Sequence, residues 1–305
     1  TISFNDGAGD LLNVDFTGTN VGTVGFLIPI TVNTGRSCYE DLELYGLGSF
    51  TKTLNTDDVC TGGNTFHQNV TFTVTSSGSR WRFGDGASAQ PDIYFGNATF
   101  SANATSGANN NFIIGANSIG NEYYGTTTFS STTLGGFYIG RSNGSGNNSH
   151  TFHGPVIINV ALNGNVTLGD AATTNLSTII LESTIQLNST ATSIGDIYVG
   201  SASGFSTITF NVNGRIIDGT ILGATNIYFN SITQNNALPN NTTSGAATAS
   251  TIYVGNALPA NACIFNGTVT FISPNISLRG STFNNVNSFQ ANGVTNFTSF
   301  GGNTF

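Results

Sequence analysis

Two short motifs recur along this chain, and their repetition is the feature that most constrains how it can fold. The first motif reads TFHQNVTF from Thr65, TFHGPVII from Thr151 and IFNGTVTF from Ile264. The second is an apolar run closed by Gly or Asn: DIYFG at Asp92, NFIIG at Asn111, GFYIG at Gly136, DIYVG at Asp196, NIYFN at Asn226 and TIYVG at Thr251. If VTLG at Val166 is a degenerate copy, most intervals are roughly 25 to 30 residues, a period typical of solenoids.

Each copy is typical of a short strand followed by a turn. No stretch of ten residues combines helical periodicity with capping residues. A unit this short cannot bury an apolar face alone, but stacked units form a continuous core. The sequence therefore predicts an all-β fold, a parallel β-helix (β-solenoid) with coils of about 25–30 residues. Tandem β-sandwich domains are the alternative; they would suit the intervals of the first motif but not the six copies of the second.

The composition favours stacked coils. Only 7% of the residues are charged, whereas Gly (39 residues), Phe (23 residues) and Asn are abundant. Identical positions of successive coils lie roughly 4.8 Å apart, so Phe can stack inside and Asn amides can bond along the stack, while repeated like charges would repel. We expect a stacked core file at the equivalent motif positions, with a corner of positive φ at the Gly that follows most of them: Phe95, Ile114, Ile139, Val199, Phe229 and Val254.

Residues 45–305 carry the repeats, whereas residues 1–44 match them less clearly and are predicted to be a strand-rich start or linking region. The pentapeptide GGNTF stands at Gly62–Phe66 and again at Gly301–Phe305, each time eleven residues after a Ser-Phe pair. We expect the repetition to continue beyond Phe305, or a second copy to dock there and form a fibre. Thr1 begins no recognisable signal peptide, so the chain is interpreted as a processed product or an excerpt.

Charge, hydropathy and cysteine pattern narrow the range of partners. A net charge of −8 with scattered Arg argues against nucleic acid. The absence of a long apolar run argues against a membrane-embedded chain. Neither a metal site nor a cofactor is predicted, because no Cys/His spacing suits zinc and Asp6 and Asp10 are interpreted as turn residues rather than calcium ligands. Cys38 and Cys60 are a possible disulfide if the chain is secreted, and Cys263 is expected to be a small buried residue.

No catalytic constellation is evident. His67 and His153 occupy the motif position that holds Asn266 in the third copy, which indicates a structural role, and His150 is expected to be exposed. The acidic pairs Asp57-Asp58 and Glu40-Asp41 are expected in solvated turns. Removing any single charged residue is therefore predicted to leave the fold and the role largely intact.

Trp81 lies between Arg80 and Arg82 in SRWRFGDG. An exposed Trp between two guanidinium groups would be a possible ligand-stacking site for a sugar. An alternating strand would instead turn Trp81 to one face and both Arg residues to the other, and this is the favoured interpretation.

The string GSFTKTLNTDDVCTGGNTFHQNVTFTVTSSGSRWRFGDG, together with IYFG, IYVG, NGTVTF and NGNVTLG, resembles the repeats of giant secreted cell-surface proteins that the type IX system exports. In style it is also similar to autotransporter-type β-helical adhesins. The resemblance, over about residues 45–305, implies a non-catalytic extracellular or cell-surface fibre, adhesin or matrix component. Its partners would be other copies or further repeats of the chain and surface glycans. The alternative function is a carbohydrate-binding or polysaccharide-cleaving β-helix.

Overall fold

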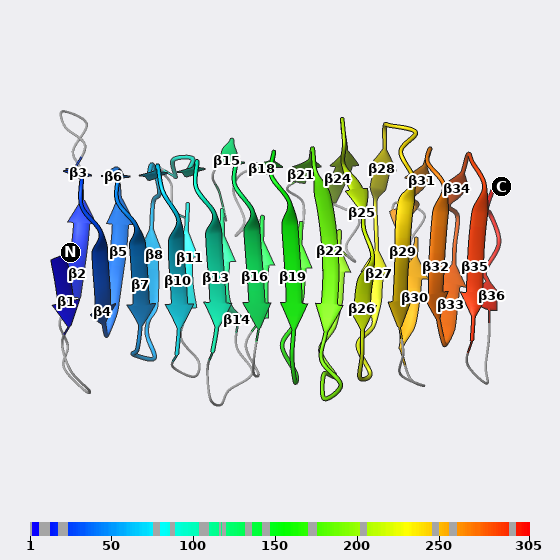
Figure 1. The fold of residues 1–305 in the computed structure, drawn as a ribbon, viewed down its shortest axis with the longest axis horizontal. Helices are drawn as coiled ribbons and strands as arrows, with labels where there is room; N and C mark the ends of the chain where they lie inside the picture. The colour runs from blue at the N-terminus through cyan, green and yellow to red at the C-terminus, as the bar shows by residue number, and fades with distance from the viewer. Residues whose placement is uncertain are drawn as a thin grey trace.

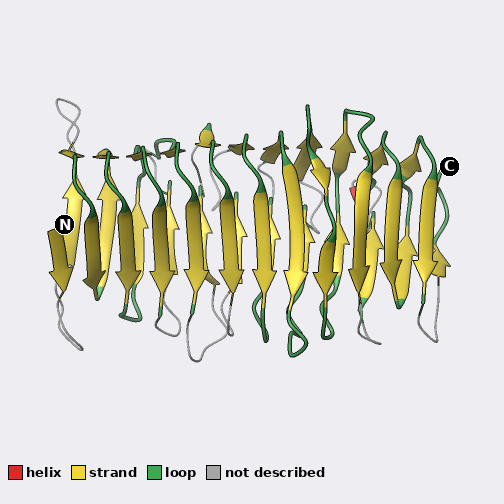
Figure 2. Ribbon diagram, viewed as in Figure 1, coloured by secondary structure: helices red, strands yellow, loops and turns green. Residues whose placement is uncertain are grey.

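The chain folds into a β-solenoid in which parallel strands stack along one long axis, with the two ends of the chain at opposite ends of the stack (Figure 1). The computed structural model describes residues 2–5, 13–17, 24–75, 80–85, 89–103, 110–115, 117, 120–131, 136–141, 147–169, 176–201, 206–245, 250–255, 261–292 and 297–305. Within these residues, strands dominate the regular structure (Figure 2), and every pairing between strands is parallel. The predicted fold class is confirmed.

Three faces form the stack, and successive strands visit them in turn. The front face of Figure 1 contains two sheets that follow one another along the axis. The first sheet has the strands β1 (Ile2–Asn5), β4 (Ile30–Thr34), β7 (Gly48–Lys52), β10 (Val70–Val74), β13 (Ala98–Ala102), β16 (Thr127–Ser131), β19 (Val156–Val160), β22 (Thr184–Ser189) and β25 (Arg215–Ile216). The second has β26 (Gly219–Ile221), β29 (Asn240–Gly245), β32 (Val269–Ser273) and β35 (Asn287–Ala291).

The other two faces are equally regular. The upper face consists of β3 (Val24–Phe26), β6 (Leu42–Leu44), β9 (Thr65–Phe66), β12 (Ile93–Tyr94), β15 (Asn121–Tyr123), β18 (Asn148–Phe152), β21 (Ser177–Leu181), β24 (Ser206–Phe210), β28 (Ile232–Gln234), β31 (Ile264–Phe265) and β34 (Thr282–Phe283). The back face consists of β8 (Asp57–Cys60), β11 (Arg80–Phe83), β14 (Asn110–Ile114), β17 (Gly136–Ile139), β20 (Val166–Leu168), β23 (Ile197–Val199), β27 (Ile227–Phe229), β30 (Thr251–Val254), β33 (Asn275–Leu278) and β36 (Phe297–Ser299). Two further strands, β2 (Asn13–Thr17) and β5 (Arg36–Glu40), pair with each other and precede β8 of the back face in the chain.

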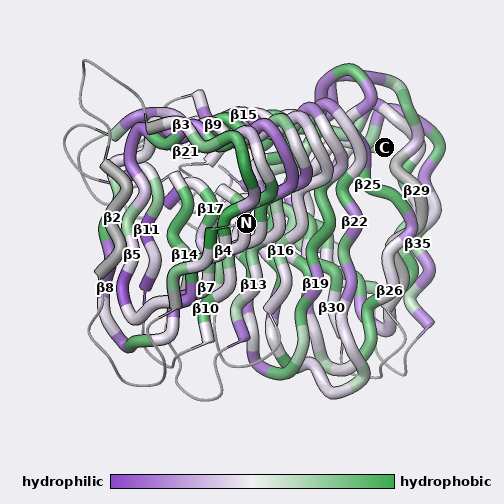
Figure 3. Tube along the Cα trace, turned by 60° about the vertical axis from the view of Figure 1, so that its left-hand side comes forward, coloured by the Kyte–Doolittle hydropathy of each residue, from purple (hydrophilic) through white to green (hydrophobic). Residues whose placement is uncertain are grey.

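Along each strand the side chains alternate between the core and the outside, as the alternating hydropathy of the coils illustrates (Figure 3). In the front face the inward file includes Phe50, Phe72, Phe100 and Phe129, whose successive ring centroids are 5.3, 5.2 and 5.5 Å apart. In the upper face Phe66, Tyr94, Tyr123 and Phe152 stack at 5.0, 4.8 and 4.4 Å. All eight rings are at most 1% exposed, so the expected internal stacking of aromatic residues is present.

Five of the six predicted core residues form one buried file on the back face. Ile114 pairs with Ile139, and Val199 pairs with Phe229, which pairs with Val254. Leu168 of VTLG joins Ile139 to Val199, so the degenerate copy belongs to the series. The expected positive φ occurs at the glycines that follow, with values of 62 to 98° at Gly115, Gly140, Gly169, Gly200 and Gly255.

The prediction for Phe95 is wrong. DIYFG at Asp92 belongs to β12 of the upper face, where Tyr94 points inward and Phe95, 47% exposed, lies past the strand end. The back-face position in that part of the stack is held by Phe83, which pairs with both Cys60 and Ile114. Upper-face and back-face strands share the same local pattern of an apolar run before a turn, so the motif alone does not indicate the face.

The repeated frame that ends in GGNTF has the same structure in both copies. Gly62 and Gly63 have φ of 91 and 82°, and Gly301 and Gly302 have φ of 87 and 71°. The Asn that follows accepts a hydrogen bond from a backbone N–H of the preceding coil each time: Asn64 from Leu42 at 3.1 Å and Asn303 from Ser281 at 3.0 Å. The motif is therefore the corner that leads from the back face to the upper face.

The coils vary in length more than the repeats predict. Asn97 and Thr126, bonded across neighbouring coils, are 29 residues apart, but Asn266 and Asn284 are only 18 apart. Residues 2–44 do not form a separate layer in the described part of the chain. Instead, β1 pairs with β4, which pairs with β7, and β3 pairs with β6, which pairs with β9, so these strands are the first coils of the same stack.

Candidate functional site: an aromatic ridge along one corner

Five outward-facing rings line the corner between the upper and front faces: Tyr45, His67, Phe95, Tyr124 and His153, here called the corner ridge. Each ring belongs to the residue that directly follows an upper-face strand, from β6 to β18. Successive centroids are 4.1, 5.4, 5.1 and 4.5 Å apart, with interplanar angles of 5 to 15°. The corner ridge is thus one continuous stack that crosses five coils.

The rings of the corner ridge are accessible mainly at their edges. Tyr45, Phe95 and Tyr124 are 42, 47 and 46% exposed, and the side chains of both histidines are about 30% exposed. Because each ring covers the faces of its neighbours, the stack presents hydroxyls, ring nitrogens and C–H edges to a partner. A sugar or an apolar group could stack only at the two ends.

Acidic side chains on the outside of the upper face bind the histidines of the corner ridge. Glu43 accepts hydrogen bonds from the Tyr45 hydroxyl and from Nε2 of His67, the latter at 3.1 Å. These two bonds lower the pKa of the Glu43 carboxyl. The first ring pair is thereby fixed to a single carboxylate.

His153 lies between two glutamates of neighbouring coils. Its Nε2 is 2.5 Å from Oε2 of Glu122, and its Nδ1 is 2.7 Å from Oε2 of Glu182. Partial burial by itself would lower the pKa of His153, but the hydrogen bonds to Glu182 and Glu122 outweigh that effect and raise it. The imidazolium form, which donates from both nitrogens, fits this arrangement and joins three coils by ion pairs.

In the coils after His153, the equivalent corner position no longer holds a ring. It holds Glu182 and then the amide residues Asn211, Asn235, Asn266 and Asn284. The Asn235 amide donates to Oδ1 of Asn211 at 2.6 Å, and the Asn284 amide donates to Oδ1 of Asn266 at 2.8 Å. His67, His153 and Asn266 therefore occupy equivalent places, as their motif position predicts, but the two histidines also belong to the exposed aromatic stack.

The predicted ligand-stacking residues do not form a site. Trp81 is fully buried in β11 and contacts Phe72 and Phe83, so a sugar outside cannot stack on it. Arg80 and Arg82 point outward, where Arg82 binds Asp57 at 2.8 Å and Asp85 at 3.2 Å. The alternating strand is the arrangement that the structure has.

Cys38 and Cys60 are free thiols that form no disulfide. An interaction with the Cys60 side chain raises the pKa of the Cys38 thiol. Cys38 also donates to the Val59 carbonyl oxygen at 3.3 Å. A disulfide between Cys38 and Cys60 stays a prediction, since Cys38 lies on the outward side of β5 whereas Cys60 is fully buried. Cys263 is fully buried, as expected.

Two expectations about charged or ionisable groups are wrong. His150 is fully buried rather than exposed, and its burial lowers its pKa to about 4. Asp58 does not lie in a solvated turn: it is 4% exposed and pairs with Lys52, itself 0% exposed, at 3.1 Å. Both errors have one cause, because a polar residue at an inward strand position looks exposed in the sequence yet is enclosed by neighbouring coils.

The remaining expectations concern Asp6 and Asp10, a metal site and a membrane-spanning segment. Asp6 and Asp10 lie outside the described residues. Among the residues described, no group of three or more His, Cys, Asp or Glu side chains is arranged to hold a metal ion. Nor does that part of the chain contain a helix long and apolar enough to span a membrane.

Sequence reasoning missed the corner ridge because its members differ in type and belong to different motifs. A signal was present: an aromatic or histidine follows the strand-ending residue in LEL-Tyr45, TF-His67, IY-Phe95, EY-Tyr124 and TF-His153. Comparison with known proteins adds no family to this picture, since no family model, no curated protein and no solved structure matches the chain.

Proposed function

We propose that this chain is an extracellular structural or adhesive β-solenoid, a non-catalytic segment or subunit of a cell-surface fibre or matrix. The observation that carries the proposal is the corner ridge, an exposed stack of rings held in register by a rigid column of coils. Partly exposed aromatic residues on a pre-organised scaffold are frequent anchors in binding surfaces. The partners would be other copies or repeats of the chain and surface glycans.

The electrostatics of the ridge favour binding over catalysis. Glu122 and Glu182 are both bonded to His153, and Glu43 is bonded to Tyr45 and His67. Hydrogen-bonded in this way, the carboxylates stabilise the stack and orient its edges. Polar ring edges and carboxylates at regular intervals would suit the hydroxyl groups of a glycan that lies along the corner.

An adhesion assay with the full chain tests the proposal. Beads coated with the protein should bind glycan or matrix surfaces, and Phe95→Ser should weaken that binding by removing the central ring. Tyr228→Ser is the matched control, since Tyr228 also stacks between two rings, Tyr198 at 4.4 Å and Tyr253 at 4.6 Å, but on the back face. Equal loss of binding in both variants, or a native protein that protease treatment of intact cells cannot reach, would contradict the proposal.

A carbohydrate-cleaving solenoid is the second candidate, favoured by one feature: Glu122 and Glu182 lie on either side of His153 at the surface. Glycosidases use paired carboxyl groups as acid and base or nucleophile. Turnover of any polysaccharide in a panel, abolished by Glu122→Gln with the fold intact, would replace the adhesive proposal by this one.

A further inference from the structure

The outer surface of the first front-face sheet differs from the other two faces in its chemistry. Its first six strands, β1 to β16, place two parallel files of residues outward, in register from coil to coil. In β19 and β22 the register of the first file continues with Ile157 and Gln186. The first file consists of Ser3, Thr31, Ser49, Thr71, Thr99 and Thr128. The second, two residues further along each strand from β4 onward, consists of Asn33, Thr51, Thr73, Ser101 and Ser130. Between the two files the inward residues are buried, so both files lie on one surface.

These two files, here called the hydroxyl array, carry no charge and no aromatic ring. The other two faces do carry charged or aromatic residues at outward positions, including Glu43 and Glu122 on the upper face and Arg82 and Tyr198 on the back face. Within the described residues, the hydroxyls of the first file make no hydrogen bond to the protein. They are therefore available to water or to a ligand along the whole file.

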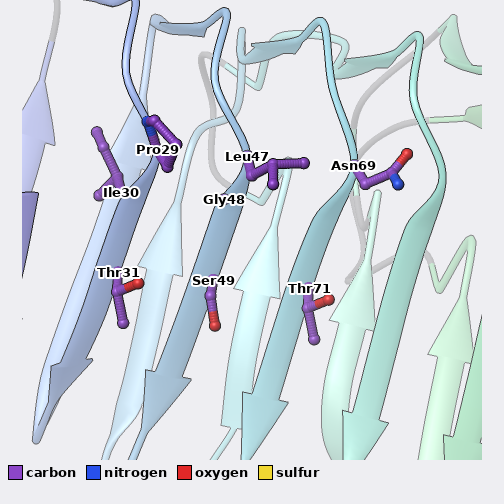
Figure 4. A pocket seen from close by; sticks show the side chains of 8 residues that line it. All are labelled: Pro29, Ile30, Thr31, Leu47, Gly48, Ser49, Asn69 and Thr71. Carbon is purple, nitrogen blue, oxygen red and sulfur yellow. The ribbon is translucent and has the colours of Figure 1, made fainter. Parts of the chain in front are cut away.

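A surface hollow overlies the start of the array. It has a volume of about 350 Å³ and spans three coils, with Thr31, Ser49 and Thr71 among its lining residues. Figure 4 shows these three side chains in one row across neighbouring strands, with Gly48 contributing no side chain beside them. Hydroxyl groups and apolar side chains such as Leu47 line the same hollow, an environment that can hold ordered water between the coils.

The array has translational order in two directions. Successive coils repeat roughly every 4.8 Å, and alternate residues of one strand lie roughly 6.6 Å apart. Hexagonal ice also presents its oxygen atoms in regular rows, so a periodic array of hydroxyls can face it row by row. A partner that engages every row at once must itself be periodic, which favours a crystal surface over a single small molecule.

We propose that the hydroxyl array of the front face binds ice. The Thr side chains offer a hydroxyl that joins the water lattice and a methyl group that confines neighbouring waters. Because the coils hold the rows rigidly, each weak contact adds to the next without a further cost of ordering the protein. A crystalline polysaccharide is disfavoured because the array has no aromatic ring on which sugars could stack.

The test is thermal hysteresis and inhibition of ice recrystallisation by the full 305-residue chain. We expect a freezing-point gap that grows with protein concentration and crystals with flat faces. Thr99→Tyr, at the fifth of the six positions of the first file, should remove most of the activity because the ring holds the surface away from the lattice. Thr207→Tyr is the control, since Thr207 is an exposed outward residue of β24 on the upper face.

Circular dichroism melting establishes that each variant is folded. If Thr99→Tyr fails to fold, Thr99→Lys disrupts the array with a flexible side chain and should give the same loss. Absence of hysteresis in the unmodified chain, or equal loss in the Thr99 and Thr207 variants, would overturn the proposal. Binding to microcrystalline cellulose or chitin that requires Thr99, without any effect on ice, would overturn it in favour of a polysaccharide.

Discussion

The ion pair between Lys52 and Asp58 gives the sharpest prediction about stability. Asp58 accepts hydrogen bonds from Nε of Arg36 at 3.1 Å, the backbone N–H of Ser37 at 3.0 Å and the Thr56 hydroxyl at 3.2 Å, besides its ion pair with Lys52. Burial lowers the pKa of the Lys52 ammonium, and the charge of Asp58 and its hydrogen bond with Lys52 oppose that effect. Asp58→Asn keeps the shape of the side chain but leaves the Lys52 charge uncompensated.

Removing one partner of a buried pair typically costs about 3–5 kcal/mol. Lys52 also donates to the backbone oxygen and the hydroxyl of Thr56, at 2.6 and 2.8 Å. Arg36, whose side chain is 45% exposed, can turn to water. We therefore expect a loss near the lower end, about 3 kcal/mol. This expected loss stands against the prediction that any single charged residue can be removed with the fold largely intact, and the measurement decides between them.

Urea unfolding followed by circular dichroism measures the loss, and hydrogen exchange of β7 and β8 localises it. Asp57→Asn is the control, because Asp57 is 44% exposed and its surface pairs contribute at most about 1 kcal/mol. Lys52→Met combined with Asp58→Asn should recover much of the stability, since the unpaired charge is gone. A loss no larger than that of Asp57→Asn, or a double variant no more stable than Asp58→Asn alone, would refute the reasoning.

Three further changes test other parts of the stack. The pKa of His153 is raised in the folded state, so its charge stabilises the fold fully below the unfolded pKa of about 6.5. That contribution is lost as the pH rises through the folded pKa. The melting temperature of His153→Asn should therefore approach that of the unmodified chain at alkaline pH. Burial raises the pKa of Asp92 to about 6, above the unfolded value of about 3.9, so the carboxyl destabilises the fold once it ionises. Asp92→Asn should therefore raise the unfolding free energy at pH 7 but not near pH 4, and an equal effect at both would contradict this. A Cβ on Gly125 would meet the backbone of Gly96, so Gly125→Ala should cost about 1–3 kcal/mol in urea unfolding. Gly25→Ala, with its nearest neighbour 4.0 Å away, should be close to neutral, and similar costs at both sites would be inconsistent with the packing.

The stacked fold could be predicted from sequence because each coil must bury its apolar residues against its neighbours in the same way. An inward apolar residue recurs before a Gly of positive φ at Ile114, Ile139, Val199 and Val254, and this recurrence is visible without coordinates. The sparse charge follows from the same geometry, since identical positions lie one strand spacing apart.

The face to which each strand belongs was decided only by the tertiary structure. Phe95 and Phe83 stand in similar local patterns, yet one lies outside a corner and the other is in the core. The difference depends on how many residues each preceding corner uses, and the coils vary in length. Burial of His150 and Asp58 depended likewise on coils above and below them, which are distant in sequence.

Both candidate surfaces arise from this stacking. The corner ridge joins Tyr45, His67, Phe95, Tyr124 and His153, which no single motif unites. The sequence by itself determined that coils would stack, because a short apolar unit can bury its surface only against its neighbours. The tertiary structure decided which outward residues stand in line, because the register between coils is fixed by core packing and corner length together, and only then do separate side chains become one surface.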